Sequence, residues 1–356
     1  MALLFSPLAI RTLELANRIC VPPMCCCLSE DGVGSDELVR HYETLAAGGA
    51  GLVVVEATAV AANGRITTRC LGLYNDEQEA FFKKLLAGCR KAAPEGTKFF
   101  IQLSHSGRKG SRCDPKKGRG TLSAGEGGFE LLAPSAFPFS PDAPVPREMT
   151  EEDIASVLDA FRDAARRACR AGFDGIQVHA AHGYLVHQFF SPVTNRRTDA
   201  WGGSAENRRR FALAVFDAVR EGAGECPVMV RLSATDWIEG GLNEADALAL
   251  SQDLAAHGAD AVDVSSGGLD LTQKLPETLT AAHTAFSRRL KEETQLVTFM
   301  SGGIVEPLQA EEILRTHEAD AVCIGREMLR NPGWVWAAAQ SLSGAVQSPA
   351  SFFSGF

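Results

Sequence analysis

The chain has 356 residues, of which 45% are hydrophobic and 22% charged, and its formal net charge is −9. These values are typical of a globular protein and exclude a disordered or collagen-like chain. An acidic chain without a basic stripe also argues against a nucleic-acid partner. Basic residues do cluster locally between Arg108 and Arg119. This cluster fits either a solvated loop or a contact to a phosphate or a pyridine nucleotide.

The ten cysteines include no C-x-x-C pair, so the sequence predicts free thiols in a reducing compartment rather than a disulfide scaffold or a zinc site. Three of these cysteines are consecutive, at positions 25–27. The first residues contain no basic leader, and no apolar run reaches the ~20 residues needed to cross a bilayer. We therefore expect a cytoplasmic protein with no membrane partner.

Short apolar runs alternate with helical patterns along most of the chain. Most of these runs are continuous rather than alternating, which is typical of strands that are covered on both faces. Eight strands are predicted, at residues 18–24, 51–57, 99–103, 175–180, 228–233, 261–266, 297–302 and 321–326.

The clearest helical patterns lie between these strands, at residues 36–47, 76–92, 151–171, 205–221, 244–256 and 307–316. Thr150 and Ser204 are predicted N-caps, and Gly172 is predicted to close a helix in a left-handed conformation. Eight strand–helix units predict a single (β/α)₈ barrel domain over residues 1–356, with an N-terminal hairpin. A doubly wound sheet is the alternative, but no G-x-G-x-x-G motif follows the first strand.

Two insertions interrupt the alternation, at residues 104–149 and 183–203. Each follows a predicted strand, so each is expected on the C-terminal face of the barrel, where barrel enzymes carry their active sites. The ends of the seventh and eighth strands carry Ser301-Gly302-Gly303 and Gly325-Arg326. Glycines there let backbone N–H groups approach an anion, and the arginine adds a charged donor. These residues predict a phosphate-bearing ligand, and glycines that only form tight turns are the alternative.

The end of the fourth strand carries His179, His182 and Tyr184. Two imidazole N–H groups can hold one carbonyl oxygen, and a neutral tyrosine can donate a proton. The competing hypothesis is a metal-dependent hydrolase in which His105 joins the two histidines as a third ligand. Gln102 and Arg231, on the third and fifth strands, favour instead a planar heterocycle that has both donors and acceptors, such as a flavin.

With these residues in place, the chain resembles the Old Yellow Enzyme family of FMN-dependent ene-reductases, in particular its thermophilic-like bacterial branch. The resemblance runs from Phe5 to about Pro332. Its strongest motifs are residues 17–19, 23–25, 55–57 and 102–109, and the most specific stretch runs from His179 to Arg208.

The resemblance implies a role for each matching residue. Four residues would line the ring of a non-covalently bound FMN: Pro23, Met24, Cys25 and Ala57. Gln102 would contact its pyrimidine edge and Arg231 its N1/O2 side. The phosphate would bind at Ser301, Gly302, Gly303, Gly325 and Arg326. His179 and His182 would hold the substrate oxygen, Tyr184 would donate a proton, and Cys27 and Lys109 would face the substrate.

The implied activity is that of an NADPH dehydrogenase or ene-reductase with ping-pong kinetics. NADPH, or alternatively NADH, would reduce the flavin, and an α,β-unsaturated carbonyl or nitro compound would then be reduced. The chain departs from the branch at Cys27, where a tyrosine is typical, and in its final residues, which lack an arginine. A homodimer and a monomer therefore both stay open. The alternatives are a flavin-dependent dienoyl-CoA-type reductase and, from another class, the histidine–metal hydrolase.

Overall fold

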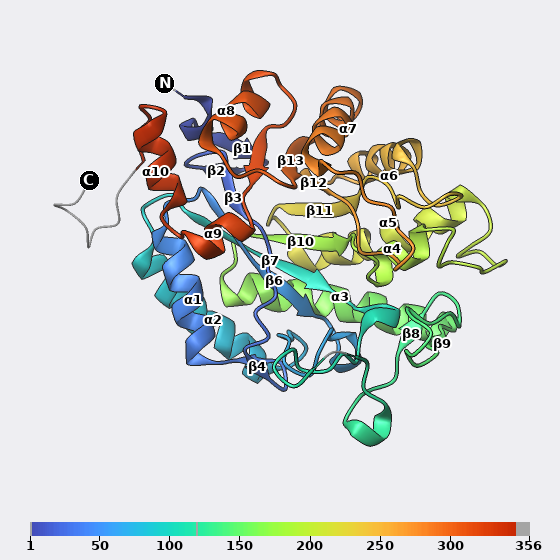
Figure 1. Cartoon of the computed structure of the whole chain (residues 1–356). Coiled ribbons are helices and arrows are strands. Elements are labelled where there is room, and N and C mark those ends of the chain that lie inside the picture. Colours follow the sequence, from blue (N-terminus) through green and yellow to red (C-terminus); the bar gives the residue numbers. More distant parts are fainter. Residues whose placement is uncertain (1, 119, 347–356) are drawn as a thin grey trace.

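Eight parallel strands close into a barrel in the computed structural model, which describes residues 2–118 and 120–346. Each strand pairs with the next one around the barrel, and the eighth pairs with the first (Figure 1). In this order the strands are β3 (Ile19–Val21), β6 (Leu52–Ala59), β7 (Lys98–Ser104), β10 (Gly175–Ala180), β11 (Val228–Ser233), β12 (Ala261–Ser265), β13 (Val297–Ser301) and β14 (Ala321–Cys323). The predicted (β/α)₈ barrel is confirmed.

Helices surround the barrel and connect its strands. They are α1 (Asp36–Ala47), α2 (Asp76–Ala92), α3 (Glu151–Ala171), α5 (Ala205–Ala223), α6 (Glu244–Ala256), α7 (Leu279–Thr294) and α8 (Pro307–Arg315). The predicted caps are confirmed: the Thr150 and Ser204 side chains accept from backbone N–H groups three residues on, and Gly172 has φ +101°. Helix α7 was not among the predicted helices, because its N-cap Thr278 makes no side-chain capping hydrogen bond and its first turn has no acidic residue.

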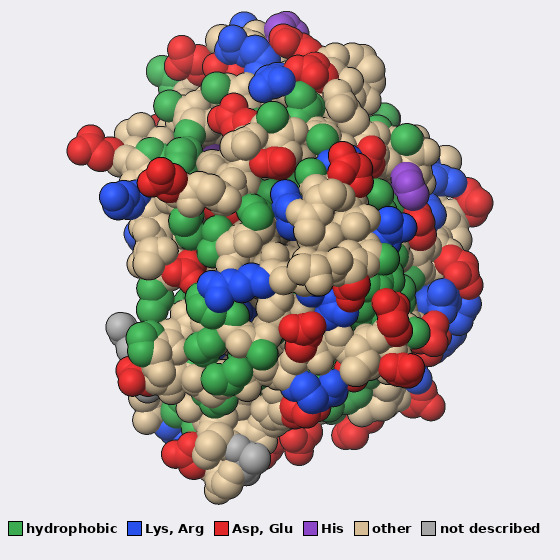
Figure 2. All heavy atoms as spheres, turned by 90° about the vertical axis from the view of Figure 1, so that its right-hand side faces the viewer, with side chains coloured by type: hydrophobic (Ala, Val, Ile, Leu, Met, Phe, Trp, Pro, Cys, Tyr) green, Lys and Arg blue, Asp and Glu red, His purple; other side chains and the backbone are tan. Residues whose placement is uncertain are grey.

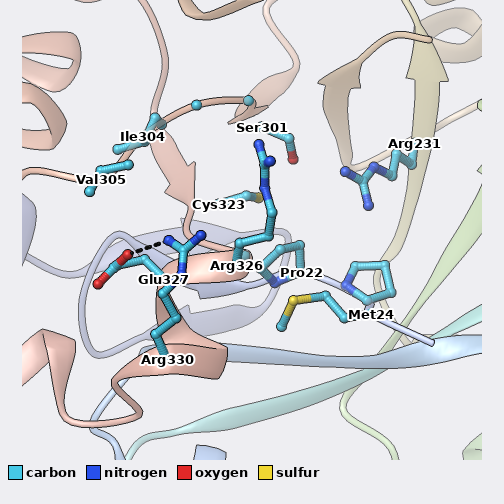
Figure 3. Close-up of a pocket in the computed structure, with 14 residues that line it drawn as sticks. Pro22, Met24, Arg231, Ser301, Ile304, Val305, Cys323, Arg326, Glu327 and Arg330 are labelled. Carbon is cyan, nitrogen blue, oxygen red and sulfur yellow. Dashed lines mark hydrogen bonds and ion pairs between the residues drawn. The ribbon is translucent and has the colours of Figure 1, made fainter. Parts of the chain in front are cut away.

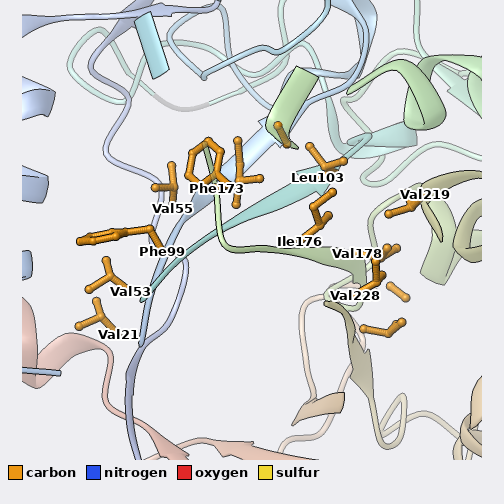
Figure 4. Close-up of a cluster of buried hydrophobic side chains, with 14 of the residues drawn as sticks. Val21, Val53, Val55, Phe99, Leu103, Phe173, Ile176, Val178, Val219 and Val228 are labelled. Carbon is orange, nitrogen blue, oxygen red and sulfur yellow. The ribbon is translucent and has the colours of Figure 1, made fainter. Parts of the chain in front are cut away.

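Alternation along the strands divides the apolar side chains between two cores. One set, which includes Val53, Val55 and Phe99, packs outward against the helices (Figure 4). The other set fills the barrel interior with residues such as Val54 and Phe100. The Phe100 ring occupies the space opposite Gly175, where an added Cβ would lie 2.3 Å from it. The base of the barrel is therefore a packed core, and only its C-terminal end is open to polar residues.

The smaller elements complete the barrel's two ends. The predicted N-terminal hairpin is β1 (Leu8–Ile10) paired antiparallel with β2 (Leu13–Leu15). A second short hairpin pairs β4 (Ser29–Glu30) with β5 (Val33–Gly34). Helix α10 (Trp334–Ser341) lies beside the N-terminal segment (Figure 1), where Phe5 occupies the space that a Cβ at Gly344 would need.

The two insertions contain structure of their own. Residues 104–149 include the parallel pair β8 (Leu132–Ala133) and β9 (Arg147–Glu148), and residues 183–203 include helix α4 (Leu185–Phe190). Figure 2 faces the side of the molecule where β8 and β9 lie in Figure 1 and shows acidic and basic side chains interspersed across it. Within the described residues, none of the helices is long and apolar enough to span a bilayer.

Two strands were predicted too long. The first strand was expected to reach Met24, but β3 ends at Val21. The eighth strand was expected to reach Arg326, but β14 ends at Cys323 and Arg326 is the first residue of helix α9 (Arg326–Arg330). Gly325, with φ −92° and ψ −94°, leaves the extended conformation between them. The apolar run alone did not reveal this turn.

Candidate active site

A cavity of ≈360 Å³ opens at the C-terminal ends of the barrel strands (Figure 3). It collects eight of the residues predicted to bind the cofactor: Pro23, Met24, Arg231, Ser301, Gly302, Gly303, Gly325 and Arg326. They come from loops and strands far apart in the sequence, so their convergence supports the predicted grouping. The prediction missed Pro22, Ile304, Val305, Cys323, Glu327 and Arg330, which also line this cavity. Several of them adjoin predicted residues in the sequence: Pro22 precedes Pro23, Ile304 follows Gly303 and Glu327 follows Arg326.

Glycines shape the wall of the cavity. Gly303 has φ +72°, a left-handed conformation that favours glycine, and an added Cβ would lie 2.6 Å from the Thr280 hydroxyl oxygen. At Gly325 an added Cβ would lie 3.5 Å from Pro22 and 3.6 Å from the Met24 sulfur, both of which line the cavity. Because Gly303 and Gly325 have no side chains, their backbone is open to a ligand at the cavity wall, and the two positions form a glycine cradle. A phosphate-bearing ligand fits this arrangement.

Two arginines on α9 differ in their partners. Arg330 forms an ion pair with Glu327 at 2.9 Å, marked in Figure 3. Over residues 2–118 and 120–346, the Arg326 side chain has neither a hydrogen bond nor an ion pair, and it extends along the cavity toward Ser301 in Figure 3. Arg326 is therefore a cation still available to an anionic ligand.

A layer of polar side chains forms the floor of the barrel mouth. Gln102, Arg231, Asp263 and Ser301 each stand two positions after an inward-facing apolar residue of a strand, and Gln177 stands two positions after Gly175, which faces the Phe100 ring inside the barrel. The Gln102 amide donates to Gln177 Oε1 at 2.6 Å, and Gln177 donates to Asp263 Oδ2 at 3.3 Å. Arg231 Nε lies 3.1 Å from the same oxygen of Asp263. Gln102 is thus connected to Arg231 beneath the cavity without lining it.

Three predicted flavin contacts are not among the residues that line the cavity. Gln102 and Ala57 are buried on β7 and β6, and Cys25 is exposed in the segment that follows β3. The backbone beside Cys25 is held by the neighbouring strand, because Cys26 N–H donates to the buried Glu56 carboxylate at 3.1 Å. The roles of these three residues stay predictions.

The predicted substrate-binding residues His179, His182 and Tyr184 form one cluster of rings. The ring centroids of His179 and His182 are 5.2 Å apart, and those of His179 and Tyr184 are 4.8 Å apart, both edge to face. His182 has φ +58°, an uncommon conformation for a residue with a side chain. Its Nε2 lies 2.8 Å from the Ser265 hydroxyl, which also accepts from Arg231 at 3.5 Å. Ser265 therefore connects the ring cluster to the cofactor cavity.

Burial keeps both histidines neutral. It lowers the pKa of His179 and of His182 well below the ordinary value, and the nearby Arg231 guanidinium lowers both further. The Ala181 N–H donates to His179 Nδ1 at 3.3 Å, so the proton of the neutral ring lies on Nε2. Burial also raises the pKa of Tyr184, which keeps its hydroxyl protonated at neutral pH.

Lys109 packs over the ring cluster from the first insertion. Its ammonium lies 5.0 Å from the Tyr184 ring centroid and 5.0 Å from that of Phe139, and it donates to the His182 carbonyl at 2.8 Å. Burial, together with Arg108 and Arg112, lowers the pKa of Lys109 to about 7. Lys109 thus fixes the turn that carries His182 and Tyr184.

Cys27 lies at a second cavity, of ≈510 Å³, with Thr67, Arg112 and Cys113 among its lining residues. Its φ is +55°, and its sulfur lies 3.9 Å from the Thr67 hydroxyl oxygen. The structure therefore places Cys27 beside the basic segment of the first insertion and does not include it in the cavity that holds Arg231 and Arg326.

The third histidine of the metal hypothesis has a different environment. His105 Nδ1 accepts from the Gly107 N–H at 3.1 Å, and its ring packs on Gly64. In the described part of the chain, no three histidine, cysteine or carboxylate side chains are grouped in a way that could hold a metal ion. The residues present therefore fit a phosphate-bearing heterocycle better than a metal.

Comparison with known proteins agrees with this geometry. Residues 3–344 match the NADH:flavin oxidoreductase / NADH oxidase family. The chain is 41% identical over 356 residues to an NADPH dehydrogenase of Geobacillus sp. (strain WCH70), covering 99% of this chain and 98% of that protein. It is also 41% identical over 351 residues to an NADPH dehydrogenase of Listeria monocytogenes serotype 4a (strain HCC23), covering 98% of each.

Solved structures of two reductases are also similar to this chain. Morphinone reductase aligns with a TM-score of 0.79 at 30% identity, covering 99% of this chain and 93% of that one. A 2-naphthoyl-CoA reductase aligns with a TM-score of 0.84 at 25% identity, and this chain spans 52% of its length. Together with the glycine cradle, the unpaired Arg326 and the floor that holds Arg231, these matches establish that the chain belongs to the Old Yellow Enzyme family of flavin oxidoreductases, with FMN as its cofactor and NADPH as its reductant.

Proposed function

We propose that the enzyme reduces the activated C=C bond of small α,β-unsaturated carbonyl and nitro compounds, with NADPH and substrate using one site in turn. The observation that carries this proposal is the ring cluster of His179, His182 and Tyr184, joined through Ser265 to the cavity that contains Arg231. His179 and Arg231 are also direct partners on the neighbouring strands β10 and β11. Substrate and cofactor groups would therefore meet at one end of the barrel.

The two histidines would polarise the substrate. A neutral His179 with its proton on Nε2 has a free N–H donor. With the Ser265 hydroxyl donating to His182 Nε2, the single proton of His182 lies on Nδ1, which is the second donor. Two donors that converge on one carbonyl or nitro oxygen stabilise the negative charge that develops there as the double bond is reduced. Because burial keeps both rings neutral, they donate hydrogen bonds without carrying charge.

Tyr184 would supply the proton to the α-carbon of the substrate. Its hydroxyl stays protonated because burial disfavours the phenolate, and its ring is fixed between His179 and the Lys109 ammonium. The Arg112 guanidinium opposes the effect of burial on the pKa of Tyr184 and so favours transient negative charge on the tyrosine when the proton leaves. This arrangement suits a general acid that acts once in each catalytic cycle.

When bound, FMN supplies the hydride chemistry, taking a hydride from NADPH and passing it to the β-carbon. We propose that Ser301, Gly302, Gly303, Gly325 and Arg326 hold its phosphate, and that Pro23, Met24, Arg231 and the buried Gln102 hold its ring system. Cys25 and Ala57 are proposed contacts to the ring, and Cys27 and Lys109 are proposed contacts to the substrate. None of the ten cysteines is in a disulfide, which fits a proposed cytoplasmic location.

The proposal is tested under nitrogen with the purified FMN enzyme. NADPH should bleach the flavin absorbance, and 2-cyclohexenone or a nitroalkene added afterwards should restore it with formation of the saturated product. Initial rates at several fixed NADPH concentrations should give parallel double-reciprocal lines. Flavin that NADPH reduces but that no enone, maleimide or nitroalkene reoxidises would contradict the proposed substrate class.

A further inference from the structure

Asp263 is a carboxylate enclosed in the barrel directly below the cofactor cavity. It is fully buried on β12 and lies 3.1 Å from Arg231 Nε through its Oδ2 atom. The Ser301 hydroxyl donates to Oδ1 at 2.8 Å, and Gln177 donates to Oδ2 at 3.3 Å. The Cys323 thiol lies 3.8 Å from Oδ1. Ser301, Gln177 and Cys323 direct donors at the carboxylate, and Arg231 faces it as an ion pair without a hydrogen bond from Nε, so the surroundings favour the ionised form.

From these contacts we infer that Asp263 is a positioning residue that compensates the charge of Arg231 and orients Gln102, and thereby lowers the reduction potential of the bound FMN. Asp263 itself does not line the cavity, so it acts through its neighbours. The inference goes beyond the proposed substrate class, because it rests on bound FMN and on no property of the enone.

The charge argument starts from Arg231. A flavin gains negative charge on reduction, so a nearby uncompensated cation favours the reduced form and raises the potential. Asp263 holds the Nε side of Arg231, and only the weaker 3.5 Å contact to Ser265 engages its Nη2. The Arg231–Asp263 ion pair thus presents guanidinium donors to the cavity, while the net charge of the two side chains together is close to zero. Burial raises the pKa of Asp263, and Arg231 and the hydrogen bond from Ser301 oppose that change.

The orientation argument follows the chain of amides. Because Asp263 can only accept, the Gln177 amide must direct its NH₂ toward it and its carbonyl oxygen toward Gln102. Gln102 in turn directs its own NH₂ to Gln177 at 2.6 Å, so its carbonyl oxygen lies on the opposite side of the amide. One buried carboxylate therefore determines the hydrogen-bonding direction of one proposed flavin contact and the net charge at another.

The test compares Asp263→Asn with the unchanged FMN enzyme by two measurements that do not depend on turnover. These are the midpoint potential against a reference dye and the affinity of the oxidised enzyme for sulfite, which adds to electron-poor flavins. We expect sulfite to bind at least tenfold more tightly. We also expect the reduction equilibrium of the flavin to shift at least tenfold toward the reduced form, which corresponds to a midpoint potential about 30 mV more positive for a two-electron couple. Asp263→Glu, which keeps the charge, should give a smaller change in both measurements.

Asp320→Asn is the matched control. Asp320 is also an aspartate held by hydrogen bonds and an ion pair, with Lys291 at 2.6 Å, but it lies just before β14, at the opposite end of the barrel from the cavity. Its replacement should leave the sulfite affinity within about twofold of the unchanged enzyme, since its charge is distant from the cavity. An unchanged or weaker sulfite affinity in Asp263→Asn, or an equal change in the Asp320 control, would overturn the inference.

A second variant covers the case in which Asp263→Asn does not fold, since that change leaves Arg231 buried without its counter-charge. The double variant Arg231→Gln/Asp263→Asn removes both charges. The inference expects its potential to lie closer to that of the unchanged enzyme than the potential of Arg231→Gln alone. If the midpoint potential of the double variant differs from that of the unchanged enzyme by at least as much as the potential of Arg231→Gln does, Asp263 does not compensate this arginine.

Discussion

The rings of His179 and Tyr184 meet edge to face, with centroids 4.8 Å apart and an interplanar angle of 72°. The contact places a neutral hydrogen-bond donor next to a protonated phenol at the end of one strand. The two residues can therefore act on different atoms of the same small substrate.

Tyr184→Phe should separate the two halves of the reaction. The phenyl ring keeps the contact with His179 but has no proton to give, so reoxidation of the flavin by an enone should slow by roughly 100- to 10,000-fold. Flavin reduction by NADPH should change little, because that step needs no proton from Tyr184. Anaerobic stopped-flow measurements of both steps check this, and an equal loss in both would remove the proposed role.

Replacing His179 and His182 together with alanine should weaken the binding of a phenol to the oxidised enzyme. Each neutral imidazole would donate one hydrogen bond to the phenolate oxygen, and hydrogen bonds to charged groups contribute about 1.5–3 kcal/mol each. We expect the dissociation constant of the phenol complex to rise at least about 100-fold. The long-wavelength absorbance of the complex measures it. An unchanged affinity for the phenol would show that the two rings do not hold the oxygen.

His105 should make the folded enzyme sensitive to acid. Burial lowers the pKa of His105 from 6.5 to about 4, so the native state binds fewer protons than the unfolded state between these values. Its stabilising contribution is complete above pH 6.5 and is lost as the pH falls toward 4. At about 1.4 kcal/mol per pH unit, roughly 2 kcal/mol should be lost by pH 5.

His105→Asn isolates this contribution, because asparagine keeps an acceptor for the Gly107 N–H and does not titrate. The other buried histidines are present in both proteins, so their effects cancel in the comparison. Urea unfolding at pH 7.5 and at pH 5 should show that the unchanged enzyme loses roughly 2 kcal/mol more than the variant. Equal losses would mean that His105 is protonated in the native state.

Cys226 should be the most readily alkylated of a pair of adjacent thiols. Its sulfur lies 3.2 Å from that of Cys169, whose hydrogen bond, assisted by Arg220, lowers the pKa of Cys226 to about 7. Cys169→Ala should raise that pKa and shift the pH profile of iodoacetamide labelling at Cys226 to higher pH. Peptide mass spectrometry across pH 6–9 measures the shift, and identical profiles in the two proteins would refute it.

Much of the fold could be predicted because local signals and the global pattern agree. The boundaries of α1, α2, α3 and α6 match the predicted ranges, since each helix starts at a capping side chain and carries an acidic first turn. The glycines and Arg326 at the last two strands were recognisable because a barrel brings the ends of all its strands to one face. Their meeting in one cavity follows from that topology.

The rest depends on contacts that the sequence does not display. Asp263 is a single charge in an apolar run, and only the barrel reveals that Arg231, Gln177 and Ser301 surround it. The turn at Gly325 is set by backbone angles, so the eighth strand was predicted too long. Predictions based on the final residues, where a branch-specific arginine is missing, fall outside the described residues.

The central claim is that the cradle at β13 and β14 binds the phosphate of FMN. Titration of the apoprotein with FMN and with riboflavin, which lacks only the phosphate, tests it by flavin fluorescence quenching. Arg326→Ala should weaken FMN binding by roughly 10- to 100-fold and leave riboflavin binding nearly unchanged. Arg330→Ala, which removes a neighbouring arginine already paired with Glu327, should affect FMN much less. We predict that the unchanged protein binds FMN more tightly than riboflavin and that Arg326→Ala largely removes this difference. Equal affinity of the unchanged protein for the two flavins would contradict the claim that the cradle binds the phosphate.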